Sequence, residues 1–398
     1  MKTTSFIIFS TFCFKYNYTI RIVKEKKCIN VNGHGVPSNE KSLLCLISSL
    51  AAVPAISYAE SPYFSLKDGD GFKRFSVSVG ALHVMPQGKA QPFQISTAVK
   101  NGEVAKNGDI KVDTVLNNLN PDVDQAGLAA ALKVVGFFTG GDLPAELSGN
   151  SKISGLESWE AQGTGLEADD VTTLGIISNY FFTDHVSFEI KGGIPPKVDL
   201  QGKGKIYAPF SAIATPQIGD LDLKFLNIDL KNDLLITDLE AYGPAASARA
   251  WTPAFEFQYH FGKTGVNKFR PYVGLGVMYA YFNELEINPR TEQDLIAAGH
   301  MIANIKEGNA GATLERTPSK ANPQVDLEAT DAIAPIATVG FTYDFNDKWF
   351  AVGSLSYAHL KNETTITVSD AKLGELIRST ADIEINPVLA YAGVGMRF

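Results

Sequence analysis

The chain has 398 residues, of which 45% are hydrophobic and 20% are charged, with a net charge of −8 at pH 7. No internal run reaches the roughly 18 consecutive apolar residues that a membrane-spanning helix needs, and the six histidines show no HExxH or other metal-binding spacing. These features exclude a helical membrane protein and argue against a zinc enzyme, so only a β-barrel could carry this chain across a membrane.

The first 59 residues carry a pattern typical of a secretory signal. Lys41 precedes an apolar run over residues 43–53, and Ile56-Ser-Tyr-Ala59 supplies the small residues of a cleavage site. A basic preface of 40 residues stands before this pattern, which suggests a mis-assigned start, with Val36 as one candidate initiator. We therefore expect residues 1–59 to be preface and signal peptide, cleaved after Ala59, and residues 60–398 to form the mature domain.

The expected cleavage changes both the cysteine content and the charge. All three cysteines, Cys13, Cys28 and Cys45, precede residue 60, so the mature chain would have no disulfide and no thiol chemistry. It would keep 28 basic and 41 acidic residues, a net charge of −13. Nucleic acid is therefore not an expected partner.

Three strands are predicted in the first half of the mature domain. The second and third lie within residues 170–197 (DVTTLGIISNYFFTDHVSFEIKGGIPPK), where the tight turn Thr183-Asp-His185 joins them. The first covers residues 72–84. Because side chains alternate between the two faces of a strand, its outward face is Phe75, Val77, Val79 and Ala81.

The clearest membrane pattern lies in residues 269–282, which read FRPYVGLGVMYAYF. Every second residue from Phe269 onward is apolar or aromatic, whereas the other face mixes Arg270, Gly274 and Gly276 with aromatic rings. A barrel strand shows this contrast when one face meets lipid and the other a narrow, partly polar lumen. This is the fifth predicted strand; the fourth covers residues 251–261, with a turn over residues 262–268.

Three further strands complete the pattern. Residues 335–345 and 349 to about 367 form the sixth and seventh, joined at Asn346-Asp-Lys348, and residues 383–398 form the eighth. The eighth strand alternates in the same way and ends on Phe398. A last strand that closes on an aromatic residue resembles the signal that bacterial outer-membrane barrels present to their assembly machinery.

Together, residues 170–197, residues 269–282 and this C-terminal strand closely resemble the OmpW/AlkL family. The resemblance implies an all-β fold, an eight-stranded antiparallel transmembrane β-barrel in the outer membrane of a Gram-negative bacterium. Its expected partners are outer-membrane lipid, small hydrophobic solutes, and the barrel assembly machinery through Phe398. In such barrels the short turns face the periplasm and the long connections face outward.

The long connections are expected to contain short helices. Thr291-Glu-Gln-Asp294 looks like a capping box before the apolar positions from Leu295 onward, and the helix should end near Gly308. Residues 125–135 (QAGLAAALKVV) predict a second helix. We interpret both as packing over the barrel mouth, with a lid or a partner-binding surface as the alternative.

Strand parity divides the expected lumen into two parts. The extracellular half should be an apolar intake, and the periplasmic half should be closed by charges that pair with one another. The intake residues are Leu82, Val84, Met278, Phe282, Ile336 and Leu389. The plug residues are Arg74, Glu189, Lys191, Glu256, His260, Arg270, Asp344 and Arg397, with the three arginines expected to pair with the three acidic residues.

The resemblance implies passive uptake of small hydrophobic molecules. Since a polar plug blocks the straight path, we expect a sideways exit into lipid near Pro387, which lacks the N–H that a sheet ladder needs. We expect no enzyme activity, catalytic residue, metal or cofactor. The alternative is a structural or receptor-like surface protein that acts through its long acidic loops. An open apolar pocket favours the channel, and a pocket filled by the first connection favours the alternative.

Overall fold

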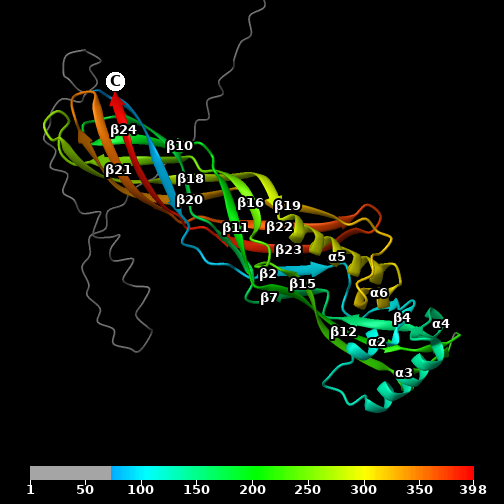
Figure 1. Cartoon of the computed structure of the whole chain (residues 1–398). Helices are drawn as coiled ribbons and strands as arrows, with labels where there is room; N and C mark the ends of the chain where they lie inside the picture. Colours follow the sequence, from blue (N-terminus) through cyan, green and yellow to red (C-terminus); the bar gives the residue numbers. More distant parts are fainter. Residues whose placement is uncertain (1–72, 220) are drawn as a thin grey trace, which may run out of the picture. The chain divides into compact units, whose positions relative to one another are not determined.

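Eight antiparallel strands close into a barrel in the computed structural model, which describes residues 73–219 and 221–398 (Figure 1). Their order is β17-β10-β9-β1-β24-β21-β20-β18, and a pairing between β17 and β18 closes the ring. The predicted fold class is thereby confirmed. The predicted signal peptide and all three cysteines lie outside the described residues. The barrel strands are β1 (Phe75–Met85), β9 (Val171–Phe181), β10 (Val186–Gly193), β17 (Ala254–His260), β18 (Phe269–Ile287), β20 (Ala332–Asp344), β21 (Trp349–Ala358) and β24 (Val388–Arg397).

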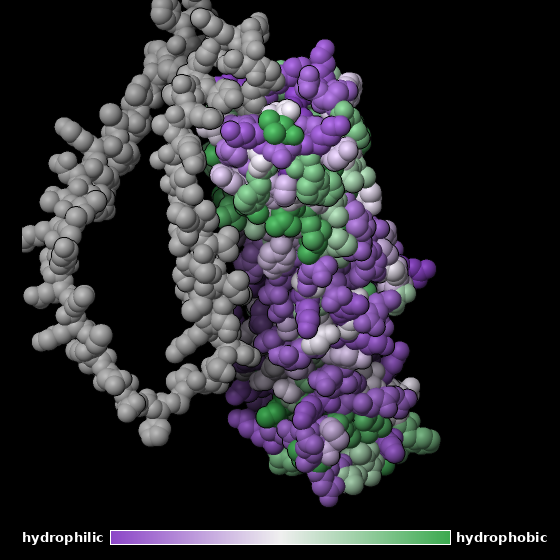
Figure 2. Space-filling view, turned by 90° about the vertical axis from the view of Figure 1, so that its left-hand side faces the viewer, coloured by the Kyte–Doolittle hydropathy of each residue, from purple (hydrophilic) through white to green (hydrophobic). Residues whose placement is uncertain are grey.

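The barrel wall places apolar side chains outside, as the alternation in β18 predicts. Leu275 is 70% exposed and Val277 is 48% exposed, whereas Arg270 and Met278 on the other face are 0% and 1% exposed. Figure 2 shows hydrophobic residues gathered in a band over the upper part of the molecule, where the barrel lies in Figure 1. Such a band fits the hydrocarbon layer of a membrane. None of the helices that the structure describes is long and apolar enough to span a membrane.

Short turns lie at one end of the barrel and long connections at the other. The turns join β9 to β10, β17 to β18, and β20 to β21; in two of them Phe182 N–H donates to the Val186 carbonyl at 2.9 Å and Phe345 N–H to the Trp349 carbonyl at 3.0 Å. The four long connections cover residues 86–170, 194–253, 288–331 and 359–387, and we call them together the extension. The expected alternation of short and long connections is therefore present.

The extension consists largely of further sheets, which the sequence analysis did not predict. One sheet has the order β19-β22-β23-β2-β7, another β15-β12-β6-β3, and two small sheets are β13-β14 and β4-β5. Strand β18 also pairs with β16 beyond the barrel, followed by β11 and β8. The strands are β2 (Phe93–Thr97), β3 (Glu103–Lys106), β4 (Ile110–Lys111), β5 (Asp142–Leu143), β6 (Asn150–Ser154), β7 (Ser158–Ala161), β8 (Gly165–Ala168), β11 (Lys197–Lys203), β12 (Lys205–Thr215), β13 (Gln217–Ile218), β14 (Leu221–Asp222), β15 (Ile228–Asp238), β16 (Pro244–Trp251), β19 (Gln324–Ala329), β22 (Lys361–Asp370) and β23 (Gly374–Glu384).

The helices of the extension are α2 (Val112–Asn117), α3 (Ala126–Thr139), α4 (Ala145–Ser148), α5 (Pro289–Lys306) and α6 (Ala310–Leu314), with a 3₁₀ turn η1 (Lys224–Leu226). Both predicted helices are confirmed, but the predicted start of α5 is wrong. Asn288 is its N-cap and accepts a hydrogen bond from Arg290 N–H at 3.0 Å, so Thr291 lies inside the first turn. A proline at the first helical position and the cap before it define this end.

Helix α5 helps to close a hydrophobic core that belongs to the extension alone. Its Leu295 and Ile302 join buried residues of several sheets, among them Phe93 and Leu376. Gly299 permits this packing, since a Cβ there would lie 2.8 Å from Val368 Cγ1 on β22. The extension is therefore a folded body with its own core rather than a set of flexible loops.

The predicted bounds of the last two strands are wrong. Regular strand structure is interrupted at His359 and Leu360 after β21, and again at residues 385–387 before β24. The segments that were expected to continue the barrel strands therefore form the separate strands β22 and β23. We call this interruption the strand break. At the break, Ile385 N–H and Asn386 N–H both donate to the Leu360 carbonyl at 3.0 Å, and Asn386 has a φ of 41°. Two donors share one carbonyl here and Asn386 has a left-handed backbone, so the regular ladder is interrupted, although the register is the same on both sides, with Tyr357 opposite Val388 and Lys361 opposite Glu384.

Candidate functional site

An apolar cavity of about 100 Å³ lies where the barrel meets the extension. Barrel residues such as Met278 and Leu389 form one part of its wall, and extension residues such as Phe93 and Ile383 form the other. The cavity therefore lies between two buried clusters that belong to different parts of the fold. An apolar lining of this kind favours an apolar guest over water.

The six predicted intake residues lie in a single hydrophobic cluster. Leu82, Met278, Ile336 and Leu389 are buried there, and Val84 and Phe282 pack against them. Four of them, Val84, Met278, Phe282 and Leu389, line the cavity. Leu82 and Ile336 belong to the same buried cluster but do not line the cavity.

A buried charged cluster comes next along the lumen toward the short turns. Glu256 pairs with Gly276 across the sheet, whereas Ala254 pairs with Met278, so Glu256 is one inward position beyond the apolar layer. Lys191 Nζ lies 2.8 Å from Glu256 Oε1 and 3.3 Å from Glu189 Oε1. We call these three residues the Lys191 cluster.

Neutral side chains supply further hydrogen bonds to the Lys191 cluster. Lys191 Nζ donates to Ser356 Oγ at 3.0 Å and to Thr338 Oγ1 at 3.3 Å, and Asn179 Nδ2 donates to Glu189 Oε2 at 2.8 Å. Gly274 leaves the room that this packing needs, because a Cβ there would lie 2.7 Å from Glu256 Oε2. Charges held in this way bridge the lumen from one wall to the other.

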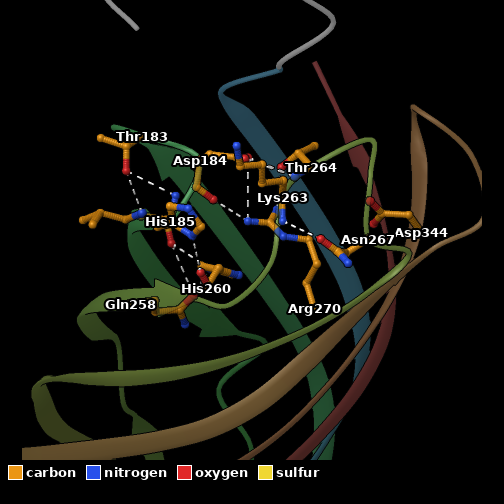
Figure 3. A network of polar contacts seen from close by, with 12 residues as sticks. Thr183, Asp184, His185, Gln258, His260, Lys263, Thr264, Asn267, Arg270 and Asp344 are labelled. Atoms are coloured by element: carbon orange, nitrogen blue, oxygen red, sulfur yellow. Dashed lines mark hydrogen bonds and ion pairs between the residues drawn. The ribbon is translucent and has the colours of Figure 1, made fainter. Parts of the chain in front are cut away.

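A second set of charged residues lies at the end of the barrel with the short turns. Arg397 Nη1 donates to Asp344 Oδ1 at 2.6 Å, and its guanidinium lies 4.4 Å from the ring centre of Phe350. Arg270 donates to Thr264 Oγ1 at 2.5 Å and to the Asp184 carbonyl, with the Asp184 carboxylate 3.8 Å away. Figure 3 shows Arg270 reaching the turn that carries Asp184.

His260 is buried near the same end of the barrel, with the rings of Phe181 and Tyr272 as neighbours. Its Nε2 lies 3.0 Å from Ser187 Oγ, and its carbonyl lies 2.8 Å from His185 Nδ1 (Figure 3). The ring also lies 4.9 Å from the centroid of Tyr272. His260 is 1% exposed, so its surroundings are those of a packed interior residue.

The predicted pairing of the three arginines with the three acidic plug residues is only partly present. Arg397 pairs with Asp344. Glu189 and Glu256 contact Lys191, Arg270 contacts Asp184, and Arg74 donates to the carbonyls of Phe181 and Phe182. Two carboxylates reach Lys191 because Glu189 precedes it by two residues on the same face of β10, and Glu256 on the neighbouring β17 lies directly opposite Glu189.

Several partners of these charges were missing from the predicted site. Thr338 and Ser356 face inward by the same strand parity as the charged residues and could have been found in that way. Asp184 could not, because it lies in a turn where the two-residue period ends.

Two residues of the cavity lining, Leu360 and Asn362, were also missing from the predicted site. They follow the strand break, so a seventh strand that continues to residue 367 places them in the wrong element.

The comparisons with known proteins agree with this architecture. The family model described as the OmpW family matches residues 143–299. Outer membrane protein W of Vibrio cholerae serotype O1 is 28% identical over 233 residues, which cover 58% of this chain and 76% of that protein. The resemblance to the OmpW family is confirmed. This OmpW-like chain is an outer-membrane barrel of a Gram-negative bacterium.

Solved structures similar to this OmpW-like chain include two outer-membrane proteins. OprG from Pseudomonas aeruginosa is 15% identical, with a TM-score of 0.41, and the alignment covers 82% of this chain and 96% of OprG. AlkL in DMPC lipid bilayers is 15% identical, with a TM-score of 0.37, and the alignment covers 85% of this chain and 96% of AlkL.

Within residues 73–219 and 221–398, no group of three or more His, Cys, Asp or Glu side chains is arranged to hold a metal ion.

Pro387 lies at the strand break and lines the cavity, and its carbonyl accepts a hydrogen bond from Ala358 N–H at 3.1 Å. The cavity thus touches the barrel wall at the residue that has no N–H to give to the ladder.

Proposed function

We propose that this OmpW-like barrel is a passive channel through which small hydrophobic molecules enter the outer membrane. Solutes bind in the apolar cavity, the charged residues of the lower lumen act as a plug, and solutes leave sideways near Pro387. The observation that carries the proposal is the position of the cavity, whose residue Met278 lies one inward position from the Lys191 cluster.

The energetics favour entry into the cavity over passage along the axis. Burial of apolar surface stabilises a guest by about 25 cal/mol per Å². A guest that moved on between Lys191 and Glu256 would separate a buried ion pair, at a cost of about 3 to 5 kcal/mol. The sideways route into lipid avoids this cost.

A groove of about 390 Å³ adjoins the cavity and supports a route of entry. It shares Leu285, Leu327 and Ala329 with the cavity lining, and its outer rim includes exposed Glu328 and Glu363. The groove lies along β19, the edge strand of its sheet. A solute would pass from this partly polar rim to the apolar cavity.

The strand break supports the exit. The β1–β24 ladder runs from Ser76–Arg397 to Met85–Val388, so regular pairing ends beside Pro387. Pro387 itself has no N–H to donate to β21, although its carbonyl accepts a hydrogen bond from Ala358 N–H on that strand. A small separation here opens the cavity toward lipid without breaking the ladder below.

Uptake measurements in whole cells test the proposal. Met278→Asp places a carboxylate in the lining and should slow uptake of a labelled aromatic hydrocarbon about tenfold, equivalent to about 1.4 kcal/mol, while Met278→Leu should leave it unchanged. Uptake of a hydrophilic sugar should be the same in all strains. In the same assay, Pro387→Ala supplies the missing N–H and should slow the hydrocarbon only.

One observation favours a second candidate, a receptor-like or structural surface protein. The extension has its own core, which a simple channel does not need. Against this, the first connection supplies only part of the cavity wall and leaves about 100 Å³ open. If Met278→Asp cells take up hydrocarbon normally and only deletions in the extension have a phenotype, the surface-protein function replaces the channel.

A further inference from the structure

One polar side chain in the cavity wall is not explained by a guest made of hydrocarbon alone. Asn362 lies on β22, on the face that also carries Thr364 and Ile366 into the lining. Its cross-strand neighbour on β23 is Ile383, another lining residue. An amide is thus set into an otherwise mainly aliphatic part of the wall.

The Asn362 side chain is 6% exposed, and its Oδ1 atom is buried without a hydrogen-bond partner. Among the described lining residues it is the one with such an atom. Asp169, a charged lining residue, differs because its Oδ2 accepts a hydrogen bond from Gln201 Nε2 at 2.7 Å. A buried acceptor left without a donor is unfavourable, and most buried polar groups in proteins have a partner.

We propose that the cavity selects apolar molecules that carry one hydroxyl group, and that Asn362 is the residue that recognises it. The hydroxyl donates to Asn362 Oδ1, and the hydrocarbon part lies against the aliphatic lining. This inference rests on the proposed function and names the class of solute. A site built to pair with a hydroxyl discriminates against the analogue that lacks one, because the protein group is then left unpaired.

Three compounds of similar size separate the contribution of the donated hydrogen bond from that of apolar burial. They are 1-hexanol, its isomer 1-methoxypentane, and n-hexane. The barrel is placed in lipid nanodiscs, and occupancy is followed by the ¹³C-methyl resonance of Met278, which lines the same cavity. Empty nanodiscs correct for partition into lipid. We expect 1-hexanol to bind about three- to tenfold more tightly than the ether, which cannot donate a hydrogen bond.

Asn362→Leu should remove this preference, since it keeps a similar volume and deletes the acceptor, and it should strengthen binding of n-hexane. Ile366→Leu, in the same lining, is the matched control and should keep the preference for the alcohol. If Asn362→Leu does not fold, Asn362→Ala gives the same comparison. The inference is overturned if the wild-type protein binds all three compounds alike or if Asn362→Leu keeps the alcohol preference. A Met278 resonance that no compound shifts would instead refute the cavity as a binding site.

Discussion

The barrel and the extension use the same two-residue alternation with opposite meaning. In β18 of the barrel the large apolar side chains are exposed, and Arg270 on the other face is fully buried. In β12 of the extension Ile206, Ala208 and Phe210 are buried, and the side chains between them are more exposed. The difference shows that the pattern reports only which face is apolar; the medium around the strand decides whether that face is the core or the surface.

The largest expected effect tests the interior of the barrel, where charged side chains are buried while apolar side chains face outward. Arg270→Ala removes a buried cation and leaves Asp184 and Thr264 without its hydrogen bonds, which should cost about 3 to 5 kcal/mol. Thermal unfolding should occur at lower temperature, and ion conductance in planar bilayers should rise. The control is Arg378→Ala in the extension, whose ion pair with Glu375 is exposed and should contribute little to stability because water screens it. Equal stability of the two variants would mean that the barrel interior is hydrated.

The next largest effect tests the hydrophobic core of the extension. Leu376→Ala removes a fully buried side chain from the extension core and should lower the free energy of unfolding by about 2 to 5 kcal/mol. Leu275→Ala on the lipid-facing side of β18 should cost less, because lipid tails fill the space and no cavity remains. The measurement is a denaturant titration in which protease cleavage of the extension is followed. It reports the unfolding of the extension separately from that of the barrel. A larger loss for Leu275→Ala would contradict the comparison.

The smallest effect concerns a turn of the extension and its dependence on pH. The Asp370 carboxylate accepts hydrogen bonds from the N–H groups of Asn322, Leu373 and Lys372, at 2.8 to 2.9 Å, and these lower its pKa. Because the folded pKa lies below the unfolded value of about 3.9, the stabilisation is present above that value and is lost as pH falls through the folded pKa.

Hydrogen exchange of the β22–β23 hairpin checks this between pH 5 and pH 3. Opening should become easier toward pH 3 in the wild-type protein and change less in Asp370→Asn, which cannot titrate. The barrel strands, which lack this group, serve as an internal reference. An identical pH response of the two proteins would show that the Asp370 contacts do not stabilise the turn.

The sequence predicted the barrel well because aromatic and aliphatic residues alternate over long, uninterrupted strands such as residues 269–282. The sheets of the extension do not follow from the sequence in the same way: β12 alternates just as regularly, but alternation alone does not say whether its apolar face meets lipid or a protein core. The burial of Lys191 and Glu256 followed from parity, but their pairing depends on which strands are neighbours. The position of Asn362 in the cavity wall does not follow from the sequence, because the irregularity at Leu360 and Asn386 places its strand β22 in another sheet.

The pairing of β1 with β24 has a consequence for the order of assembly. Tyr391 Oη donates to Ser78 Oγ at 3.1 Å across this seam, although the two residues are 313 positions apart in the chain. Contacts so distant in sequence form late, because the entropy of closing the intervening chain must be lost first. The extension sheets lie between these two strands in the sequence, so they can fold around local hairpins such as β22–β23 while the seam is still open. Synthesis and export of the last strand therefore set the earliest moment at which the membrane wall can close.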